Sequence, residues 1–322
     1  MTSTKTKGFT IIELLTVMSI IIILMSVLVP GLARSRRYAK VVVQKGQFNE
    51  ITKGLELFRN DHQETYPDSG AADTNGDGYC GAMKLCEALL GRDGMGLHPS
   101  SNFQAIQTGT YPFDLCTIIP PTAYTGTSPP QPALAANLRE RNKYTDAENI
   151  KAYRLQDIYT WEITTGVSFY TPTATFKSTT ADIPNAVIGD VFQRADIKGG
   201  TTRCLARAGQ KVGMPVLYYK ADPSKLAHDT ITQPVAGTPN TNIYNFDDNY
   251  AITALGCPWE GSAPPTGTPH PMQTDPRVFL KAITNDKVTS TPRPHNEDGY
   301  ILMSAGWDGL YGTQDDVYNF AK

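Results

Sequence analysis

The chain of 322 residues has no excess of positive charge, because 29 Lys and Arg stand against 31 Asp and Glu. A formal net charge of −2 supplies no basic face for a phosphate backbone, so we expect no nucleic-acid partner. The sequence also lacks an H-E-x-x-H zinc motif, a G-x-S-x-G nucleophile elbow and a G-x-x-x-x-G-K-[ST] phosphate loop. Without a catalytic constellation, the chain is not expected to be an enzyme.

Cysteine is scarce, with five residues in all. An odd number leaves at least one thiol unpaired in an oxidising compartment. Cys80 and Cys86 flank a short predicted helix and form the best candidate pair, but the spacing leaves the full connectivity open. The other three are Cys116, Cys204 and Cys257.

Long apolar runs are absent except for one near the N-terminus, from Phe9 to Val29. As a helix this run is about 31 Å long, close to the hydrocarbon thickness of a bilayer. Glu13 is its only charged residue, and a carboxylate at membrane depth costs about 2.5–3.5 kcal/mol, so it needs a partner or a purpose. The alternative is that Glu13 lies near the interface and stays hydrated. The run predicts a single membrane anchor.

A short polar leader, residues 1–8, ends in Gly8 directly before the sequence FTIIELL that begins at Phe9. This arrangement resembles the class III leader of type IV pilins and type II secretion pseudopilins. The resemblance implies that a prepilin peptidase cuts between Gly8 and Phe9, that Phe9 is then methylated, and that Glu13 is the fifth mature residue. A secretory signal peptide is the competing interpretation, but the apolar run exceeds the usual length of about 7–15 residues and no A-x-A site follows it.

Cleavage would create an α-amino group on Phe9 that is mostly protonated at neutral pH. The resemblance implies that this ammonium pairs with Glu13 of a neighbouring subunit, since neither charge is stable alone in hydrocarbon. We therefore expect a homo-oligomeric filament. The implied partners are other pseudopilins, an inner-membrane assembly platform, the prepilin peptidase and membrane lipid.

Four basic residues follow the apolar run and outnumber the two lysines of the leader. By the positive-inside rule alone, the large C-terminal part would lie in the cytoplasm. The leader motif takes precedence, because it implies a dedicated processing route. We expect a single inner-membrane span with a cytoplasmic leader and a head in the periplasm or on an extracellular fibre. The four residues are Arg34, Arg36, Arg37 and Lys40.

The expected fold class is α+β, with a long helical stem and a head built on a small antiparallel sheet that loop-rich insertions enlarge. Apolar residues at helical spacing beyond Pro30 predict one helix from Phe9 to Asn60 whose second half packs on the head. Two further helices are predicted over Gly81–Gly91 and Pro276–Ile283. Four strands are predicted over Tyr159–Tyr170, Val187–Phe192, Pro215–Lys220 and Tyr300–Ser304. The expected segments are a leader 1–8, an assembly helix 9–30, a stem 31–64 and a head 65–322 with an acidic loop 304–320.

Three carboxylates, Asp308, Asp315 and Asp316, follow the predicted strand Tyr300–Ser304 in a glycine-rich loop without a nearby basic residue. Hard cations are bound by such carboxylates together with backbone carbonyls. The loop resembles the C-terminal calcium loop of type II secretion major pseudopilins, which implies that these three residues bind a structural calcium ion. The alternative is a solvated acidic turn.

A second, weaker calcium candidate is the D-x-N-x-D-G segment that contains Asp73, Asn75 and Asp77. Position twelve of the corresponding EF-hand loop is Lys84 instead of the bidentate Glu, so the full motif fails. An Asx-rich turn is the alternative.

The resemblance implies a structural subunit of a type II secretion pseudopilus, a periplasmic fibre that promotes protein export. The alternative is a type IV pilin or minor pilin with an adhesive or binding head. The acidic loop favours the pseudopilus, because type IV pilins more often close their C-terminal region with a disulfide. A membrane-tethered enzyme is a third class, and no motif supports it.

Overall fold

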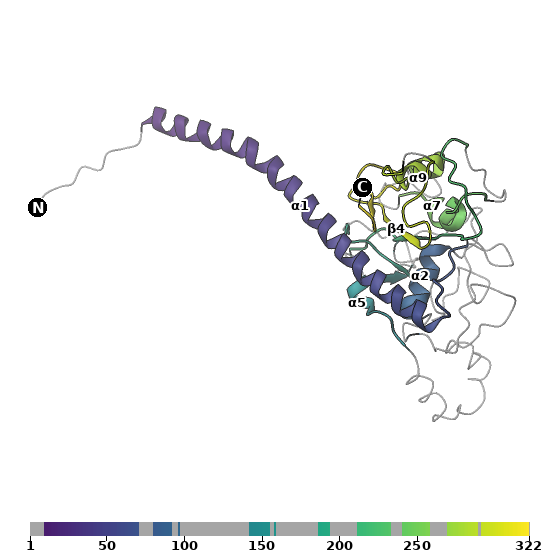
Figure 1. Ribbon diagram of the computed structural model, residues 1–322. Coiled ribbons are helices and arrows are strands. Elements are labelled where there is room, and N and C mark those ends of the chain that lie inside the picture. Colours follow the sequence, from purple (N-terminus) through teal and green to yellow (C-terminus); the bar gives the residue numbers. More distant parts are fainter. Residues whose placement is uncertain are drawn as a thin grey trace, which may run out of the picture. The chain divides into compact units, whose positions relative to one another are not determined.

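The computed structural model describes residues 10–70, 80–91, 96, 142–154, 158, 186–193, 211–232, 240–257, 269–288 and 291–321. The chain divides into two compact parts, residues 1–43 and 44–322. Helix α1 (Ile11–Asp61) is continuous through that boundary, and Pro30 lies inside it without ending it (Figure 1). The predicted stem helix is therefore confirmed.

In the first part, α1 exposes its apolar side chains on every side. From Ile11 to Val29 the large hydrophobic residues with described side chains are about half exposed or more, as in Ile11 at 84% and Leu24 at 63%. Among the described residues, α1 is the one helix that is long and apolar enough to cross a membrane. A helix that is hydrophobic all round needs an apolar medium or neighbouring helices around it.

In the second part, α1 becomes one-sided. Phe48, Ile51, Leu55 and Phe58 are at most 1% exposed, which confirms the predicted packing of the stem's second half on the head. Fully burying each such side chain contributes about 1.5–3 kcal/mol relative to leaving it in water. This apolar stripe attaches the stem to the head.

Two buried glutamines fix the position of the helix within the head. Gln44 accepts a hydrogen bond from Val191 N at 2.8 Å and donates to Gln47 Oε1 at 2.9 Å. Gln47 Nε2 then donates to the carbonyls of Ile150 at 2.7 Å and Gly189 at 2.9 Å. Because buried polar groups are costly without partners, a shift of the helix along its axis would lose the three bonds that join these glutamines to the head.

The chain that leaves α1 folds back onto it at the Tyr66-Pro67 pair. The Tyr66 hydroxyl donates to Glu56 Oε1 at 2.6 Å and accepts from Arg59 Nη1 at 2.8 Å. The Pro67 carbonyl accepts from the Tyr218 hydroxyl at 2.7 Å. These bonds connect the end of the stem to the sheet of the head.

The described part of the head contains two small antiparallel sheets. In the larger one, β4 (Tyr300–Ser304) lies between β3 (Leu217–Lys220) and β5 (Val317–Tyr318), with Leu217 opposite Met303 and Ser304 opposite Val317. The smaller one pairs β1 (Ala152–Arg154) with β2 (Ala186–Ile188). The α+β fold class is confirmed.

The predicted strands agree with the structure to different degrees. Tyr300–Ser304 is correct, whereas the strands predicted over Pro215–Lys220 and Val187–Phe192 are too long, because β3 begins at Leu217 and β2 ends at Ile188. Strands β1 and β5 were not predicted, since two or three residues carry no periodic signal. The strand predicted over Tyr159–Tyr170 lies outside the described residues.

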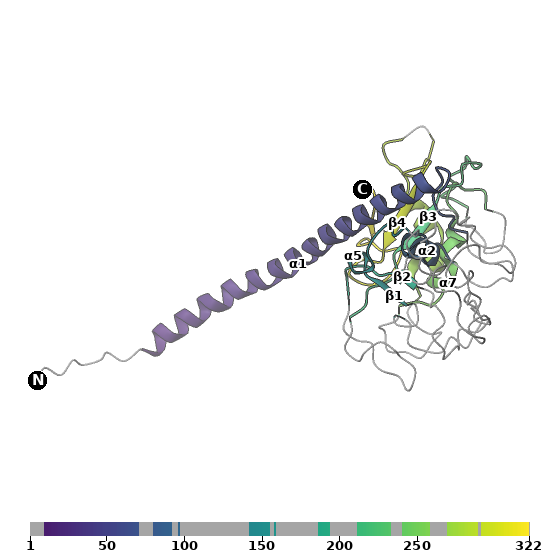
Figure 2. The same cartoon turned by 90° about the horizontal axis from the view of Figure 1, so that it is seen from below.

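Short helices surround the larger sheet. Helix α2 (Gly81–Leu90) contacts both β2 and β3 (Figure 2), and it confirms the prediction over Gly81–Gly91. Helix α9 (Arg277–Ala282) likewise confirms the prediction over Pro276–Ile283. The other helices of the described chain are α5 (Ala147–Ile150), η2 (Phe246–Asn249), α7 (Tyr250–Thr253) and α8 (Pro271–Thr274).

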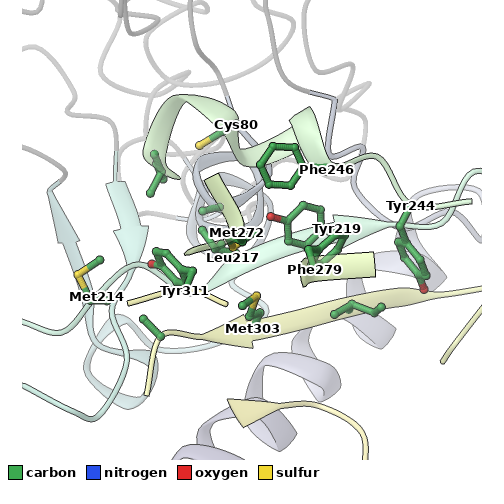
Figure 3. Close-up of a cluster of buried hydrophobic side chains, with 14 of the residues drawn as sticks. Cys80, Met214, Leu217, Tyr219, Tyr244, Phe246, Met272, Phe279, Met303 and Tyr311 are labelled. Carbon is green, nitrogen blue, oxygen red and sulfur yellow. The ribbon is translucent and has the colours of Figure 1, made fainter. Parts of the chain in front are cut away.

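The two faces of the larger sheet pack against different elements. Leu217, Tyr219 and Met303 face the main core, where the Tyr219 and Phe279 rings lie 4.4 Å apart (Figure 3). The other face carries Tyr300, which contacts the Tyr66 ring at 4.9 Å. Every residue of β4 is buried, as expected for a strand covered on both faces.

The candidate pair Cys80 and Cys86 does not form a disulfide. Both are free, buried thiols, with Cys80 at the N-cap of α2 and Cys86 inside the helix. Six residues of helix separate their Cα atoms by about 9 Å along the axis, beyond the span of a disulfide. Burial raises the pKa of Cys80 to about 11 and that of Cys86 to about 12, so both thiols stay protonated.

Two glycines of α1 predict opposite effects of substitution by alanine. A Cβ at Gly54 would lie 2.8 Å from Leu89 Cδ2 and 3.1 Å from the Tyr144 carbonyl oxygen, whereas a Cβ at Gly46 would meet no atom within 4 Å. Alanine gains about 1 kcal/mol of helix propensity at either site, but overpacking costs about 1–3 kcal/mol. We expect Gly54→Ala to lower the free energy of unfolding of the detergent-solubilised protein by about 1 kcal/mol. Denaturant titration followed by tryptophan fluorescence measures this change.

Gly46→Ala is the matched control, and we expect it to raise the free energy of unfolding by about 0.5–1 kcal/mol. Equal effects of the two substitutions would contradict the close packing of α2 and Tyr144 against Gly54.

Candidate functional site

Glu13 lies in the first turn of α1 and caps the helix. Its Oε2 accepts hydrogen bonds from Thr10 N at 2.9 Å and from Thr10 Oγ1 at 2.8 Å, while Glu13 N donates to Thr10 Oγ1 at 3.3 Å. This reciprocal arrangement is a capping box, which satisfies amides that the helix cannot pair. Within one chain, the carboxylate therefore already has partners at the helix start.

The other polar side chains of the apolar segment bond to the helix itself. Thr16 Oγ1 donates to the Glu13 carbonyl at 3.0 Å, Ser19 Oγ to the Thr16 carbonyl at 2.8 Å and Ser26 Oγ to the Ile23 carbonyl at 2.7 Å. Such bonds let a hydroxyl enter hydrocarbon without an unsatisfied donor. Glu13 thus remains the one charged group of the segment. The predicted processing residues Gly8 and Phe9 lie outside the described residues.

The predicted acidic loop is the connection between β4 and β5, which pair on either side of it. Its tight course requires left-handed backbone at three glycines, with φ of 66° at Gly306, 77° at Gly309 and 95° at Gly312. At Gly306, a Cβ would lie only 2.3 Å from the Asp315 carbonyl oxygen. The two ends of the loop therefore lie against each other.

Asp308 and Asp315 come together across this loop. Asp315 Oδ2 accepts from Trp307 N at 2.6 Å and from Asp308 N at 3.0 Å, while Asp308 Oδ1 accepts from Leu310 N at 2.8 Å. Burial, with the neighbouring Asp315 carboxylate, raises the pKa of Asp308. In the described part of the chain, no basic side chain forms an ion pair with either carboxylate.

Asp316 is turned toward different partners. Its Oδ2 accepts from Gly312 N at 2.9 Å and from the Tyr318 hydroxyl at 3.3 Å, and the residue is buried. The described residues contain no group of three His, Cys, Asp or Glu side chains arranged to hold a metal ion. The structure therefore brings Asp308 and Asp315 together and directs Asp316 into the head.

Tyr311 anchors the loop in the core. Its side chain is fully buried, its hydroxyl donates to the Pro215 carbonyl, and its amide donates to His270 Nδ1 at 3.2 Å. His270 must be neutral to accept this bond, and burial lowers its pKa to about 4. The loop is thus held in place by its own tyrosine.

A buried carboxylate that the sequence analysis missed supports the same loop from behind. Asp190 Oδ2 accepts from Ser304 Oγ at 2.8 Å, and Oδ1 accepts from the amides of Phe192 at 3.1 Å and Met214 at 3.2 Å. Ser304 is the last residue of β4, and its Oγ accepts from Gly306 N at 3.3 Å. The signal was present in the sequence, since Asp190 is the one charged residue in the predicted strand Val187–Phe192.

Asp190 also lies in the segment that forms hydrogen bonds with the stem. Its neighbours Gly189 and Val191 bond Gln47 and Gln44 of α1. One short segment therefore contacts the stem through its backbone and the base of the acidic loop through a carboxylate. The weaker calcium candidates Asp73, Asn75 and Asp77 lie outside the described residues.

One curated protein of known role is similar to part of this chain. The type IV wide pilus major component PilA4 of Thermus thermophilus is 41% identical over 66 residues, which are 20% of this chain and 50% of that protein. This similarity supports a relation between the chain and type IV pilin-like proteins. The match spans about half the length of the relative. No protein-family model matches the chain, and no solved structure gives a significant match.

The long apolar helix agrees with this pilin-like relation. An exposed membrane-length segment at the N-terminal end of α1 and a head built on a small antiparallel sheet are consistent with a single-pass, membrane-anchored protein.

The buried Asp190 predicts a pH-dependent stability. Burial raises its pKa from 3.8 to about 7, so the folded state holds a proton that the unfolded state releases between these values. The stabilisation is complete below about pH 4 and is lost as the pH rises through about 7, by at most about 1.4 kcal/mol per pH unit. We expect Asp190→Asn to reduce this slope, measured as the melting temperature of the head between pH 5 and pH 8.

Asp248, which is also buried with its pKa raised to about 7, remains in this variant and keeps part of the slope. A slope equal to that of the unmodified chain would show that Asp190 does not titrate in this range.

Proposed function

We propose that the chain is a structural, non-enzymatic pilin-like subunit that is anchored in the inner membrane by α1 and polymerises into a fibre through that helix. The observation that carries this proposal is the exposed apolar surface of α1, interrupted by a single carboxylate at Glu13. Such a surface is stable in lipid or against copies of itself, and not in water.

Glu13 can serve both the single chain and the fibre. In the single chain it caps α1 through Thr10, which lowers the cost of placing the carboxylate near the membrane. After cleavage between Gly8 and Phe9, the ammonium of an adjacent subunit offers a stronger partner, because it adds the attraction of an opposite full charge to the hydrogen bond. Exchange of the Thr10 bonds for this ammonium would favour docking at a defined register.

We further propose that the fibre is a type II secretion pseudopilus with a periplasmic head. The acidic loop supports this role, because it resembles the calcium loop of major pseudopilins. Asp308 and Asp315 lie close together in this loop, which connects β4 to β5. The second candidate is a type IV pilus, which the similarity to a pilus component favours. The two candidates predict different losses when the fibre does not form. Loss of a pseudopilus would stop protein export, whereas loss of a type IV pilus would remove surface fibres.

A calcium ion is proposed to bind the acidic loop. Asp308 and Asp315 fit a hard cation, because two carboxylates lie together without a basic ion-pair partner in the described chain, and their proximity disfavours the charge of Asp308. A bound cation would neutralise this repulsion and tie the two ends of the loop together. Asp316, the third predicted ligand, accepts hydrogen bonds from Gly312 N and the Tyr318 hydroxyl in the structure. Its carboxylate would have to turn away from these partners to join the other two.

Substitution of Glu13 tests the proposed assembly. We expect Glu13→Ala to yield a subunit that starts at methylated Phe9 in mass spectrometry but forms fewer fibres by about tenfold or more, since the partner of the ammonium is gone. Electron microscopy of fibres and the amount of secreted protein in the medium are measured in the same cells. A loss of secretion supports the pseudopilus, whereas a loss of surface fibres alone supports the pilus.

Glu13→Gln is the matched control, because glutamine keeps the capping box with Thr10 and removes the charge. We expect it to fail as Glu13→Ala does. Normal fibres in the glutamine variant would mean that capping, and not the charge, is the role of Glu13.

Calcium titration tests the acidic loop. A ligand at about a hundredfold excess over its Kd stabilises the folded state by about 2.7 kcal/mol, which corresponds to a rise of about 5–10 °C in the Tm of a head of this size. We expect calcium to raise the Tm, a chelator to reverse the rise, and Asp308→Asn to abolish it. Asp286→Asn, at an exposed turn outside the loop, is the control that keeps the full rise. A Tm that does not respond to calcium in the unmodified chain rules out the site.

A further inference from the structure

A cluster of basic residues directly after the apolar segment has no part in the functions proposed above. Arg34, Arg36, Arg37 and Lys40 fall within seven residues of α1, and we refer to these four residues as the basic collar. No Asp or Glu occurs between Glu13 and Glu50 in the sequence. The collar also runs against the charge bias expected for a segment outside the cytoplasm.

The continuous helix fixes the depth of the collar relative to the apolar segment. From Ile11 to Ala33, α1 carries no charge except Glu13 and is about 34 Å long, which matches the hydrocarbon thickness of a bilayer. If α1 spans the membrane as proposed, the next turns of the helix reach the level of the lipid headgroups. Arg34 and Arg36 are exposed at that level.

The arrangement of the collar around the helix suits a layer of headgroups. Successive residues are rotated by about 100°, so the four side chains spread over about half of the circumference. Tyr38, which is 73% exposed, lies within the collar, and tyrosine favours the same interfacial level. Long basic side chains extend along the helix and place their charges at the polar boundary.

We propose that the basic collar binds the phosphate groups of anionic phospholipids, an inference that rests on the proposed membrane anchoring. Guanidinium groups bind phosphate oxygens in a bidentate manner, which favours arginine at three of the four positions. Each basic residue at an anionic surface strengthens association by about fivefold. The collar thereby holds α1 at a fixed depth and enriches anionic lipid around the subunit.

Lipid selectivity in reconstituted membranes tests this proposal. The full chain is reconstituted into phosphatidylcholine vesicles that contain trace spin-labelled phosphatidylglycerol or spin-labelled phosphatidylcholine, and the motionally restricted fraction of each label is measured. We expect phosphatidylglycerol to be preferred by about fivefold or more, and the preference to weaken at high salt. We expect Arg34→Gln/Arg36→Gln, which removes two of the four collar charges, to abolish most of this preference.

Lys45→Gln/Lys53→Gln is the matched control, because it removes two positive charges from the same helix farther along its axis. Lys45 and Lys53 lie about 8 Å and 20 Å beyond Lys40, the last residue of the collar, so their distances from the headgroups are about one and about two Debye lengths. This variant is expected to keep the preference of the unmodified chain.

Two results overturn the proposal while leaving the membrane anchor intact. One is equal restriction of both labels by the unmodified chain, and the other is an unchanged preference in Arg34→Gln/Arg36→Gln. If neither label is restricted, α1 does not enter the bilayer, and the proposed anchoring fails together with the collar.

Discussion

The burial of Phe48, Ile51, Leu55 and Phe58 between α1 and the rest of the head is the interaction on which the structure depends. It removes water from one face of the second half of the helix, and the bonds of Gln44 and Gln47 then select one register. Apolar contact alone tolerates sliding, whereas three directional bonds to fixed backbone groups do not. Together they make the second half of α1 an integral part of a globular head.

The segment that receives this helix also supports the acidic loop. Gly189 and Val191 bond the stem, and Asp190 between them bonds Ser304 at the end of β4. The loop that follows is held by the buried Tyr311 and by amides that donate to the carboxylates of Asp308 and Asp315. Backbone and tyrosine contacts thus set the course of the loop in the structure.

The order of charges along α1 follows a simple physical sequence. A capped carboxylate at Glu13 begins the helix, an uncharged apolar segment follows, and basic residues from Arg34 to Lys40 come next. In the proposed membrane-spanning orientation, the apolar segment would occupy the hydrocarbon and the basic residues after it would reach the headgroup layer. Thr16, Ser19 and Ser26 do not interrupt the segment, because their hydroxyls bond to the helix backbone.

The sequence by itself determined the helix, its apolar and one-sided halves, strand β4 and the acidic loop, because each rests on local periodicity or on closely spaced residues. Only the tertiary structure decided that Asp190 lies behind the loop, that Asp316 faces Tyr318 while Asp308 meets Asp315, and that Cys80 and Cys86 stay apart. These facts depend on contacts between segments distant in the chain or on the direction of single side chains. Neither is encoded in residue spacing, because long-range packing selects them after the local elements have formed.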